Sequence, residues 1–121
     1  IIPLRGKGLW GPIWGYVSLE DDYNTVYGAV FDHKTETPGL GAEINTTWFQ
    51  KPFKGKNIFN QSGEFVGINI YKGGSGAAAN AGDLKHGVDG ISGGTITSKG
   101  VEAMIHDNLN LYTAYFNKNK N

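Results

Sequence analysis

The chain has 121 residues, enough for one domain with a hydrophobic core, and 39% of them are hydrophobic. Eleven basic and eleven acidic residues leave no net formal charge, so the sequence lacks the basic surplus typical of proteins that bind nucleic acid or anionic lipid. The absence of cysteine excludes disulfides, cysteine nucleophiles and iron–sulfur ligation, and no apolar run is long enough to predict a membrane span.

Two alternating segments early in the chain predict a β-hairpin. Polar and apolar residues alternate over residues 14–20 and again over residues 26–32, and the turn-forming run Asp21–Asn24 separates them. We expect Tyr16 and Tyr27 to pack across these two strands.

The run Thr37–Gly41 predicts a turn, because its proline fixes φ and its glycines break regular structure. A short helix is expected over Ala42–Phe49, ending before Pro52. Glu36 suits a general base or an acceptor of hydrogen bonds from nearby N–H groups, and the second role is the commoner one beside such a turn. His33 has no second ligand at metal spacing, so we expect a polar residue at a strand end.

The middle of the chain predicts a second hairpin, in which residues 58–59 and 65–71 flank the turn-forming run 60–63. Residues 73–80 carry too little apolar mass for a strand and predict a mobile loop. His86 and Asp89 are close enough to suggest an acid–base pair, but a turn cap is the more frequent role for such an aspartate.

Apolar residues at helical spacing predict an amphipathic helix over Ser98–Phe116, with Glu102 complementing the dipole of its first turn. The apolar residues are Val101, Met104, Ile105, Leu109, Tyr112 and Phe116. Residues 117–121 have nothing to bury and are expected to fray. The elements together predict one α+β domain over residues 1–121: antiparallel hairpins form a twisted sheet, packed by this C-terminal helix and the short middle helix.

A glycine-rich turn with three hydroxyl groups precedes the predicted C-terminal helix, within Asp89–Thr97. The hydroxyls belong to Ser92, Thr95 and Thr97. Gly93 and Gly94 allow the backbone to approach a ligand, and the unpaired N–H groups of a helix start attract an anion. The stretch predicts a phosphate site with a hydroxyl pointing into it. The alternative is a flexible loop in which Thr97 or Ser98 caps the helix.

Two of these stretches resemble motifs of the FMN-binding domain family. Asp89-x-x-Ser92-Gly93-Gly94-Thr95 is similar to its D-x-x-[ST]-G-A-T signature, and residues 33–41 are similar to its H-x-x-E-T-P-G-L-G segment. In that family the final threonine carries FMN through a phosphoester bond, which here implies Thr95. Gly94 departs from the family's alanine; a more flexible residue there would loosen the phosphate or slow attachment, but it removes no reacting atom.

The chemistry of the residues in these stretches makes them candidates for contact with the two ends of such a cofactor. Those expected around the phosphate are Ser92, Gly93, Gly94 and Thr97. Those expected around the isoalloxazine ring are Trp10, Thr37, Gly39, Leu40 and Gly41. An indole and an apolar side chain would cover the ring faces, while N–H groups of the turn would address its polar edge.

The opening Gly6–Trp10, followed by Gly15 and Tyr16, resembles flavin-bearing subunits of Na⁺-pumping NADH:quinone reductases. This implies an electron carrier with covalent FMN, which catalyses nothing by itself, and the other subunits of that membrane complex as partners. It also implies a separate flavin transferase that uses FAD and a divalent metal to load Thr95. The expected location is the extracytoplasmic (periplasmic) face of a bacterial inner membrane, reached through a membrane helix ahead of Ile1 that this sequence does not include.

Three alternatives stay open from the sequence. The corresponding subunit of Rnf ferredoxin:NAD⁺ oxidoreductases shares the threonine motif and the T-P-G-L-G turn. An extracytoplasmic module could bind FMN, or another phosphate ligand, without a covalent bond. A purely structural interaction domain would bind no flavin at all.

Overall fold

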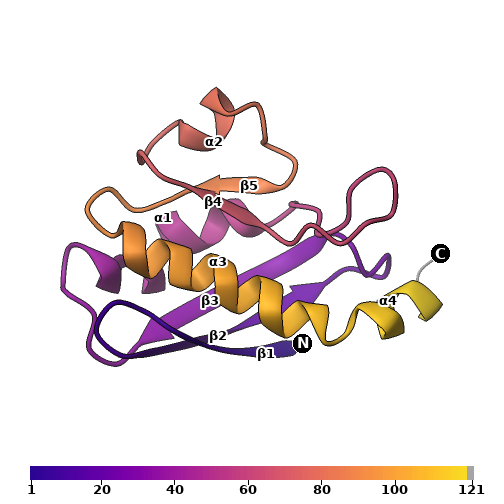
Figure 1. The fold of residues 1–121 in the computed structure, drawn as a ribbon, viewed down its shortest axis with the longest axis horizontal. Helices are drawn as coiled ribbons and strands as arrows, with labels where there is room; N and C mark the ends of the chain where they lie inside the picture. The colour runs from indigo at the N-terminus through magenta and orange to yellow at the C-terminus, as the bar shows by residue number, and fades with distance from the viewer. Residues whose placement is uncertain (120–121) are drawn as a thin grey trace.

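A three-stranded antiparallel sheet forms one layer of the fold in the computed structural model, which describes residues 1–119 (Figure 1). Strands β1 (Ile2–Lys7), β2 (Pro12–Leu19) and β3 (Val26–His33) are neighbours in that order. Strands β2 and β3 confirm the predicted first hairpin. Strand β1 pairs along the whole of its length with β2, from Ile2 opposite Val17 to Lys7 opposite Pro12.

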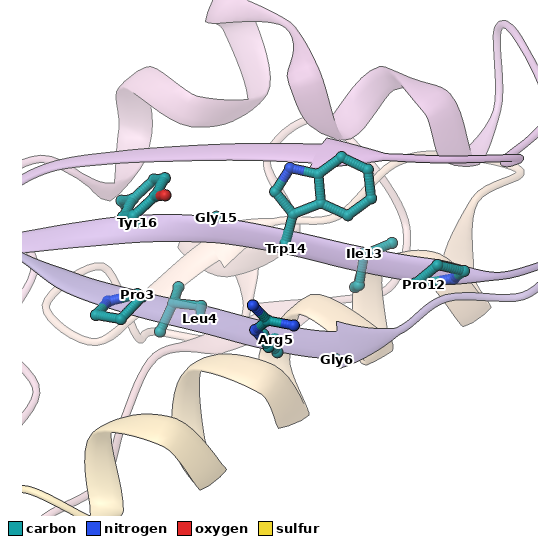
Figure 2. A pocket seen from close by; sticks show the side chains of 9 residues that line it. All are labelled: Pro3, Leu4, Arg5, Gly6, Pro12, Ile13, Trp14, Gly15 and Tyr16. Carbon is teal, nitrogen blue, oxygen red and sulfur yellow. The ribbon is translucent and has the colours of Figure 1, made fainter.

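The sheet buries one face and exposes the other, as period-two alternation requires. The buried side chains of its strands are Leu4, Ile13, Val17, Val26 and Phe31. The outer face exposes Trp14, Tyr16 and Val30. Figure 2 shows Trp14 and Tyr16 projecting from β2 beside Arg5 of β1, where they line a shallow hollow of about 270 Å³.

Only one of the two tyrosines has the cross-strand neighbour expected of it. Tyr16 lies directly opposite Val30. Tyr27 is the extra residue at the point where the register shifts after Ser18, so it has no opposite partner in β2. Its ring instead lies 5.4 Å from Lys54 Nζ.

The helical segment after β3 is broken into three short turns, where one helix over residues 42–49 was predicted. These are η1 (Gly41–Asn45), α1 (Thr47–Gln50) and η2 (Lys51–Phe53). The break lies at Thr46, whose backbone is extended with φ −89° and ψ 153°. The segment also continues through its proline, because Pro occupies the first turn of η2, where its missing N–H is not needed.

The predicted second hairpin is wrong apart from one isolated antiparallel bridge, between Phe59 and Phe65. The Asn60 side chain holds this turn by accepting hydrogen bonds from the N–H groups of residues 62 and 64. Beyond it, Gly67 has φ +67° and redirects the chain. Strand β4 (Asn69–Tyr71) then pairs in parallel with β5 (Gly87–Asp89).

The glycine-rich segment between β4 and β5 contains one helical turn, α2 (Ala77–Asn80), which the sequence did not predict. The Asp89 carboxylate holds this turn by accepting hydrogen bonds of 2.8 Å from the N–H groups of Gly76 and Ala78. Asp89 is thus a cap, as expected. It forms no acid–base pair with His86, whose Nδ1 lies 2.7 Å from the Asn57 carbonyl oxygen.

The predicted C-terminal helix is two helices, α3 (Thr95–Asn110) and α4 (Thr113–Asn119), with a break at residues 111–112. Helix α3 begins three residues earlier than expected, at Thr95 instead of Ser98. Glu102 therefore lies beyond its first turn, and its carboxylate accepts a 2.6 Å hydrogen bond from the Ile70 N–H of β4. Residues 117–119 are helical; residues 120 and 121 of the expected frayed end lie outside the described residues.

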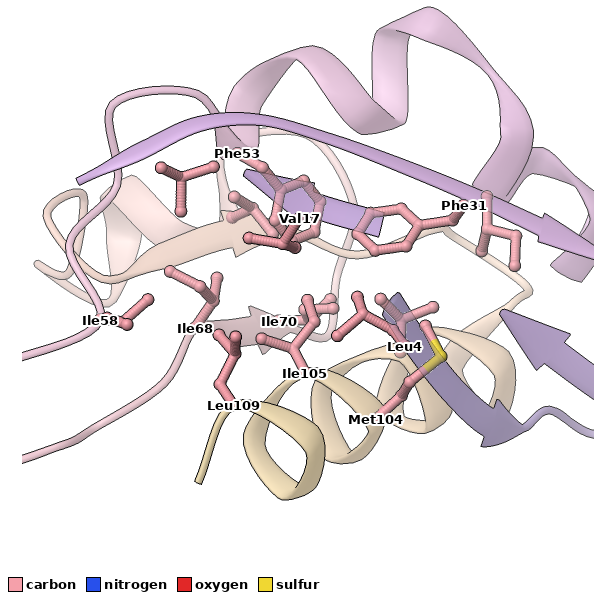
Figure 3. Close-up of a cluster of buried hydrophobic side chains, with 14 of the residues drawn as sticks. Leu4, Val17, Phe31, Phe53, Ile58, Ile68, Ile70, Met104, Ile105 and Leu109 are labelled. Atoms are coloured by element: carbon pink, nitrogen blue, oxygen red, sulfur yellow. The ribbon is translucent and has the colours of Figure 1, made fainter. Parts of the chain in front are cut away.

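The core lies between the sheet, α3 and β4 (Figure 3). Helix α3 runs across the buried face of the sheet in Figure 1, and it contributes Val101, Met104, Ile105 and Leu109. The core also contains three phenylalanine rings whose centroids lie 5.0–5.9 Å apart, those of Phe31, Phe49 and Phe53. The predicted α+β class is therefore confirmed. Within residues 1–119, no helix has the length and apolar character needed to cross a bilayer.

Replacing Leu109 by alanine should lower the free energy of unfolding by about 2–5 kcal/mol, because the leucine is 0% exposed and leaves a cavity. Leu111→Ala is the matched control: this leucine, two residues away, is 80% exposed, and its truncation should change stability by less than about 0.5 kcal/mol. Urea unfolding of both variants measures the difference. Equal losses would contradict the placement of α3.

Candidate functional site

A cavity of about 240 Å³ lies between the loop joining β1 to β2, the turn before η1 and the start of α3. The residues that line it are Leu9, Trp10, Thr37, Leu40, Gly41, Gly93, Gly94, Thr95, Ile96 and Thr97. It gathers eight of the ten residues predicted to contact a cofactor, from three parts of the chain. The hollow in Figure 2 is a separate feature of the outer sheet face and contains none of them.

The two predicted site residues outside this lining are Gly39 and Ser92. Gly39 has φ +79°, and a side chain there would meet nothing within 4 Å, so it shapes the turn without facing the cavity. Leu9 and Ile96 line the cavity but were not predicted. Ile96 lies in the first turn of α3, so a prediction that starts this helix at Ser98 does not place its side chain at the cavity.

The turn from Thr37 to Gly41 is closed by its own backbone. The Thr37 carbonyl accepts hydrogen bonds from the N–H groups of Leu40 and Ala42, at 3.0 and 3.1 Å. The predicted turn is confirmed. These two N–H groups are used within it and are not available to address the polar edge of a ligand.

The backbone at Gly93 and Gly94 lies close against this turn and leaves little room for a side chain. Gly93 has φ +78°, and a Cβ there would lie 2.7 Å from Leu40 Cδ2. A Cβ on Gly94 would lie 3.0 Å from Ile91 Cγ2. Gly93 thus favours glycine through its positive φ, and a Cβ there would also displace the end of the Leu40 side chain. Gly94 has a negative φ, and alanine there would need Ile91 and the Leu40 backbone, 3.2 Å away, to shift by a few tenths of an ångström.

The start of α3 offers three N–H groups to the cavity. Gly94 is the residue before the helix and provides no side-chain cap. Among residues 1–119, no acceptor faces the backbone N–H groups of Thr95, Ile96 and Thr97, and the first bond of the helix runs from the Ser98 N–H to the Gly94 carbonyl. A 16-residue helix therefore presents its positive dipole end and free donors at this point.

The alternative in which a hydroxyl caps this helix is wrong. The Thr97 hydroxyl donates to Glu36 Oε1 instead. The Ser98 hydroxyl oxygen accepts a 3.0 Å hydrogen bond from the Ile91 N–H, so it ties the turn to the helix side.

The three candidate hydroxyls have different environments. Thr97 is 2% exposed and its hydroxyl is engaged by Glu36. Ser92 is exposed and lies outside the cavity lining. Thr95 is half-buried, lines the cavity, and its hydroxyl has no hydrogen-bond partner within residues 1–119. Of the three, only Thr95 both lines the cavity and has a hydroxyl without a hydrogen-bond partner within residues 1–119.

Glu36 accepts hydrogen bonds, which was the expected role. It is 4% exposed, and its two carboxylate oxygens accept 2.8 Å bonds from the Leu9 and Trp10 N–H groups. Burial alone raises the pKa of the Glu36 carboxyl, but its hydrogen bonds outweigh burial and lower the pKa below its ordinary value. His33 Nδ1 accepts from the Glu36 N–H at 3.1 Å, at the end of β3 as expected.

The donor set suits a phosphate ester with an apolar end, not a metal ion. No group of three or more potential metal ligands occurs in the described part of the chain. The cavity instead combines free N–H donors and a hydroxyl at one side with the exposed side chains of Leu9, Trp10, Leu40 and Ile96. Gly93 and Gly94 belong to the same lining and leave backbone without side chains at this part of the cavity.

The sequence profile of the FMN-binding domain matches residues 8–110, which include the glycine turn and Thr95. The chain belongs to the FMN-binding domain family. The C subunit of the Na⁺-translocating NADH-quinone reductase of Haemophilus ducreyi is 46% identical over 102 residues, covering 84% of this chain and 37% of that protein. Its counterpart from Neisseria meningitidis is 38% identical over 122 residues, covering 99% and 45%.

Solved structures agree with this assignment. The crystal structure of the C subunit from Parabacteroides distasonis matches with a TM-score of 0.82 at 50% identity, covering 94% of this chain and 54% of that one. NqrC from Shewanella oneidensis matches with a TM-score of 0.75 at 33% identity, covering 96% and 53%. The chain thus spans less than half of the two curated relatives and just over half of these two solved chains.

Replacing Gly39, Gly93 or Gly94 by alanine should separate the energetic cost of a positive φ from the cost of a close contact. Gly39→Ala should cost about 1–2 kcal/mol, because its φ is positive but its surroundings are open. Gly93→Ala should cost more, since the same strain is joined by the contact with Leu40, and Gly94→Ala should cost least. Urea unfolding measures all three, and a larger loss at Gly94 than at Gly93 would contradict the geometry.

Proposed function

We propose that this domain carries one FMN, bonded through its phosphate to Thr95 Oγ1, as an electron carrier. The observation that supports the attachment point is the Thr95 hydroxyl itself, which is free of internal hydrogen bonds and lines the cavity beside three unpaired N–H groups. When bound, FMN would supply the redox chemistry, and the chain would bind and orient it.

The phosphate end would lie at the start of α3. The N–H groups of residues 95–97 would donate to its oxygens, and the helix dipole would add about 0.3–1 kcal/mol of favourable interaction with the negative charge. The close packing of Gly93 and Gly94 against Leu40 and Ile91 would hold this backbone in place against the ligand.

The ring end would lie along the apolar side chains of the same cavity. Trp10 is 64% exposed and Ile96 is 58% exposed, and both line this one cavity. Apolar side chains grouped in this way, and not the exposure of any one of them, suit a ligand with an apolar ring. Leu9 and Leu40 are also exposed at this rim. The ring would cover this surface and contact the indole.

Attachment would require a separate flavin transferase with FAD and a divalent metal. Thr95 Oγ1 would attack the phosphorus of the FMN half of FAD, forming the Oγ1–P bond and breaking the P–O bond of the pyrophosphate. AMP would leave, and the hydroxyl proton would pass to a base of the transferase. The chain supplies the acceptor hydroxyl and no other reacting group, so the isolated domain would catalyse no turnover.

The larger assembly is proposed from the relatives. Since the proteins from Haemophilus, Neisseria and Parabacteroides are C subunits of Na⁺-translocating NADH-quinone reductases, we place the domain in such a respiratory complex in preference to an Rnf complex. Its partners would be the other subunits, and it would lie on the periplasmic side of a bacterial inner membrane. Residues 1–121 would form one FMN-binding domain of a longer polypeptide.

The attachment point can be tested by co-expression with the flavin transferase and peptide mapping by mass spectrometry. Thr95→Ala should contain no covalent FMN, while Thr95→Ser, Ser92→Ala and Thr97→Val should each retain it. Flavin on residue 92 or 97 of the wild-type chain, or on Thr95→Ala, would overturn the assignment. A wild-type chain that binds flavin but loses it on denaturation would indicate a non-covalent module, and one that binds none would indicate an interaction domain.

The ring environment can be tested by flavin fluorescence. Trp10→Ala should increase the emission of the attached flavin, because an indole in contact with the ring quenches it, and it should leave attachment intact. Trp48→Ala is the matched control, since Trp48 is similarly exposed but belongs to α1 and lies outside the cavity lining. Equal emission from the wild type and Trp10→Ala would remove Trp10 from the site.

A further inference from the structure

The cavity is built from elements that lie far apart in the sequence. Its apolar side includes Leu9 and Trp10, on the loop between β1 and β2. Its hydroxyl side is the first turn of α3, which begins 85 residues after Trp10 (95 − 10). A ligand that contacts both sides needs the loop and the helix to be held at a fixed separation.

One buried side chain links them. Glu36 Oε1 accepts from the Leu9 N–H at 2.8 Å and also from the Thr97 hydroxyl, while Oε2 accepts from the Trp10 N–H at 2.8 Å. The carboxylate thus holds two successive N–H groups of the loop and one hydroxyl of the helix. Both N–H groups are bound to Glu36, while the side chains of Leu9 and Trp10 are exposed and line the cavity.

The surrounding glycines make room for this carboxylate. A Cβ on Gly8 would lie 2.5 Å from Glu36 Oε1, and a Cβ on Gly41 would lie 3.2 Å from the same oxygen and would collide with Thr97 Oγ1. Two of the three chain segments that approach Glu36 therefore do so through glycine. Charge-assisted hydrogen bonds of this kind are about twice as strong as neutral ones, which offsets the cost of burying the charge.

We propose that Glu36 is the positioning residue of the flavin site, which fixes the Leu9–Trp10 loop against the first turn of α3 and so sets the ring-side wall relative to the Thr95 hydroxyl. Glu36 is absent from the cavity lining, so it acts through Leu9, Trp10 and Thr97 and does not touch the ligand. This inference rests on the proposed function for the ligand, but the link between loop and helix belongs to the protein without it.

The test compares Glu36→Gln with Glu43→Gln in the 121-residue chain, each with and without flavin transferase. Glu43 is half-buried, lies seven residues further along, and makes no side-chain hydrogen bond within residues 1–119, so its variant controls for the loss of one charge. The Glu36→Gln side chain keeps an acceptor oxygen but turns an NH₂ group toward the remaining donors. Thr97→Val removes only the helix side of the link and serves as a second variant if Glu36→Gln does not fold.

Two measurements report position separately from stability. In the flavin-free chain, the Leu9 and Trp10 amides should exchange hydrogen about tenfold faster or more in Glu36→Gln, while Glu43→Gln matches the wild type. In the flavin-loaded chain, FMN should still map to Thr95, but its visible circular dichroism should fall toward that of free FMN. Thr97→Val should shift the circular dichroism in the same direction by less.

Unchanged amide exchange and unchanged flavin circular dichroism in folded Glu36→Gln, even with a lower melting temperature, would overturn the positioning role and leave Glu36 as a stabilising residue. If that variant does not fold, unchanged circular dichroism in Thr97→Val overturns it. A wild-type chain that takes no FMN would instead refute the proposed function, and amide exchange at Leu9 and Trp10 would then decide whether Glu36 fixes the loop.

Discussion

Helix α3 crosses strand β1 at a distance that ordinary side chains would not permit, and the site depends on this approach. A Cβ on Gly6 would lie 2.7 Å from Met104 Cβ, and a Cβ on Gly100 would collide with the Lys7 carbonyl oxygen. Glycine on both elements allows strand and helix to meet backbone to backbone. Since Gly100 lies just beyond the first turn of α3, the contact brings that turn beside the loop that follows β1.

The same helix serves the core and the cavity with different parts of its length. Its later turns bury Val101, Ile105 and Leu109, each contributing about 1.5–3 kcal/mol by leaving water. Its first turn contributes free N–H groups and hydroxyls, which a hydrophobic core could not accommodate unpaired. Packing of the distal turns thus holds the polar end of the helix in place.

Local patterns in the sequence predicted those parts whose partners are close in the chain. Alternation marked β2 and β3, the proline–glycine run marked the turn before η1, and the hydroxyl-rich motif marked the glycine turn at the start of α3. The pairing of β4 with β5 was missed because parallel partners are distant in sequence and three-residue strands carry little periodicity. The start of α3 was misplaced because Thr97 looked like a cap, whereas its hydroxyl has a buried partner 61 residues away.

The positions of the tryptophans have a consequence for spectroscopy. All three tryptophans of the chain, Trp10, Trp14 and Trp48, are exposed, and none belongs to the core, which is packed by phenylalanine and aliphatic side chains. Indole emission shifts to longer wavelength when a buried ring meets water, so here its maximum would already lie near that of the unfolded chain. Intrinsic fluorescence is therefore a weak reporter of global unfolding for this domain, and the far-ultraviolet signal of α3 is the better one.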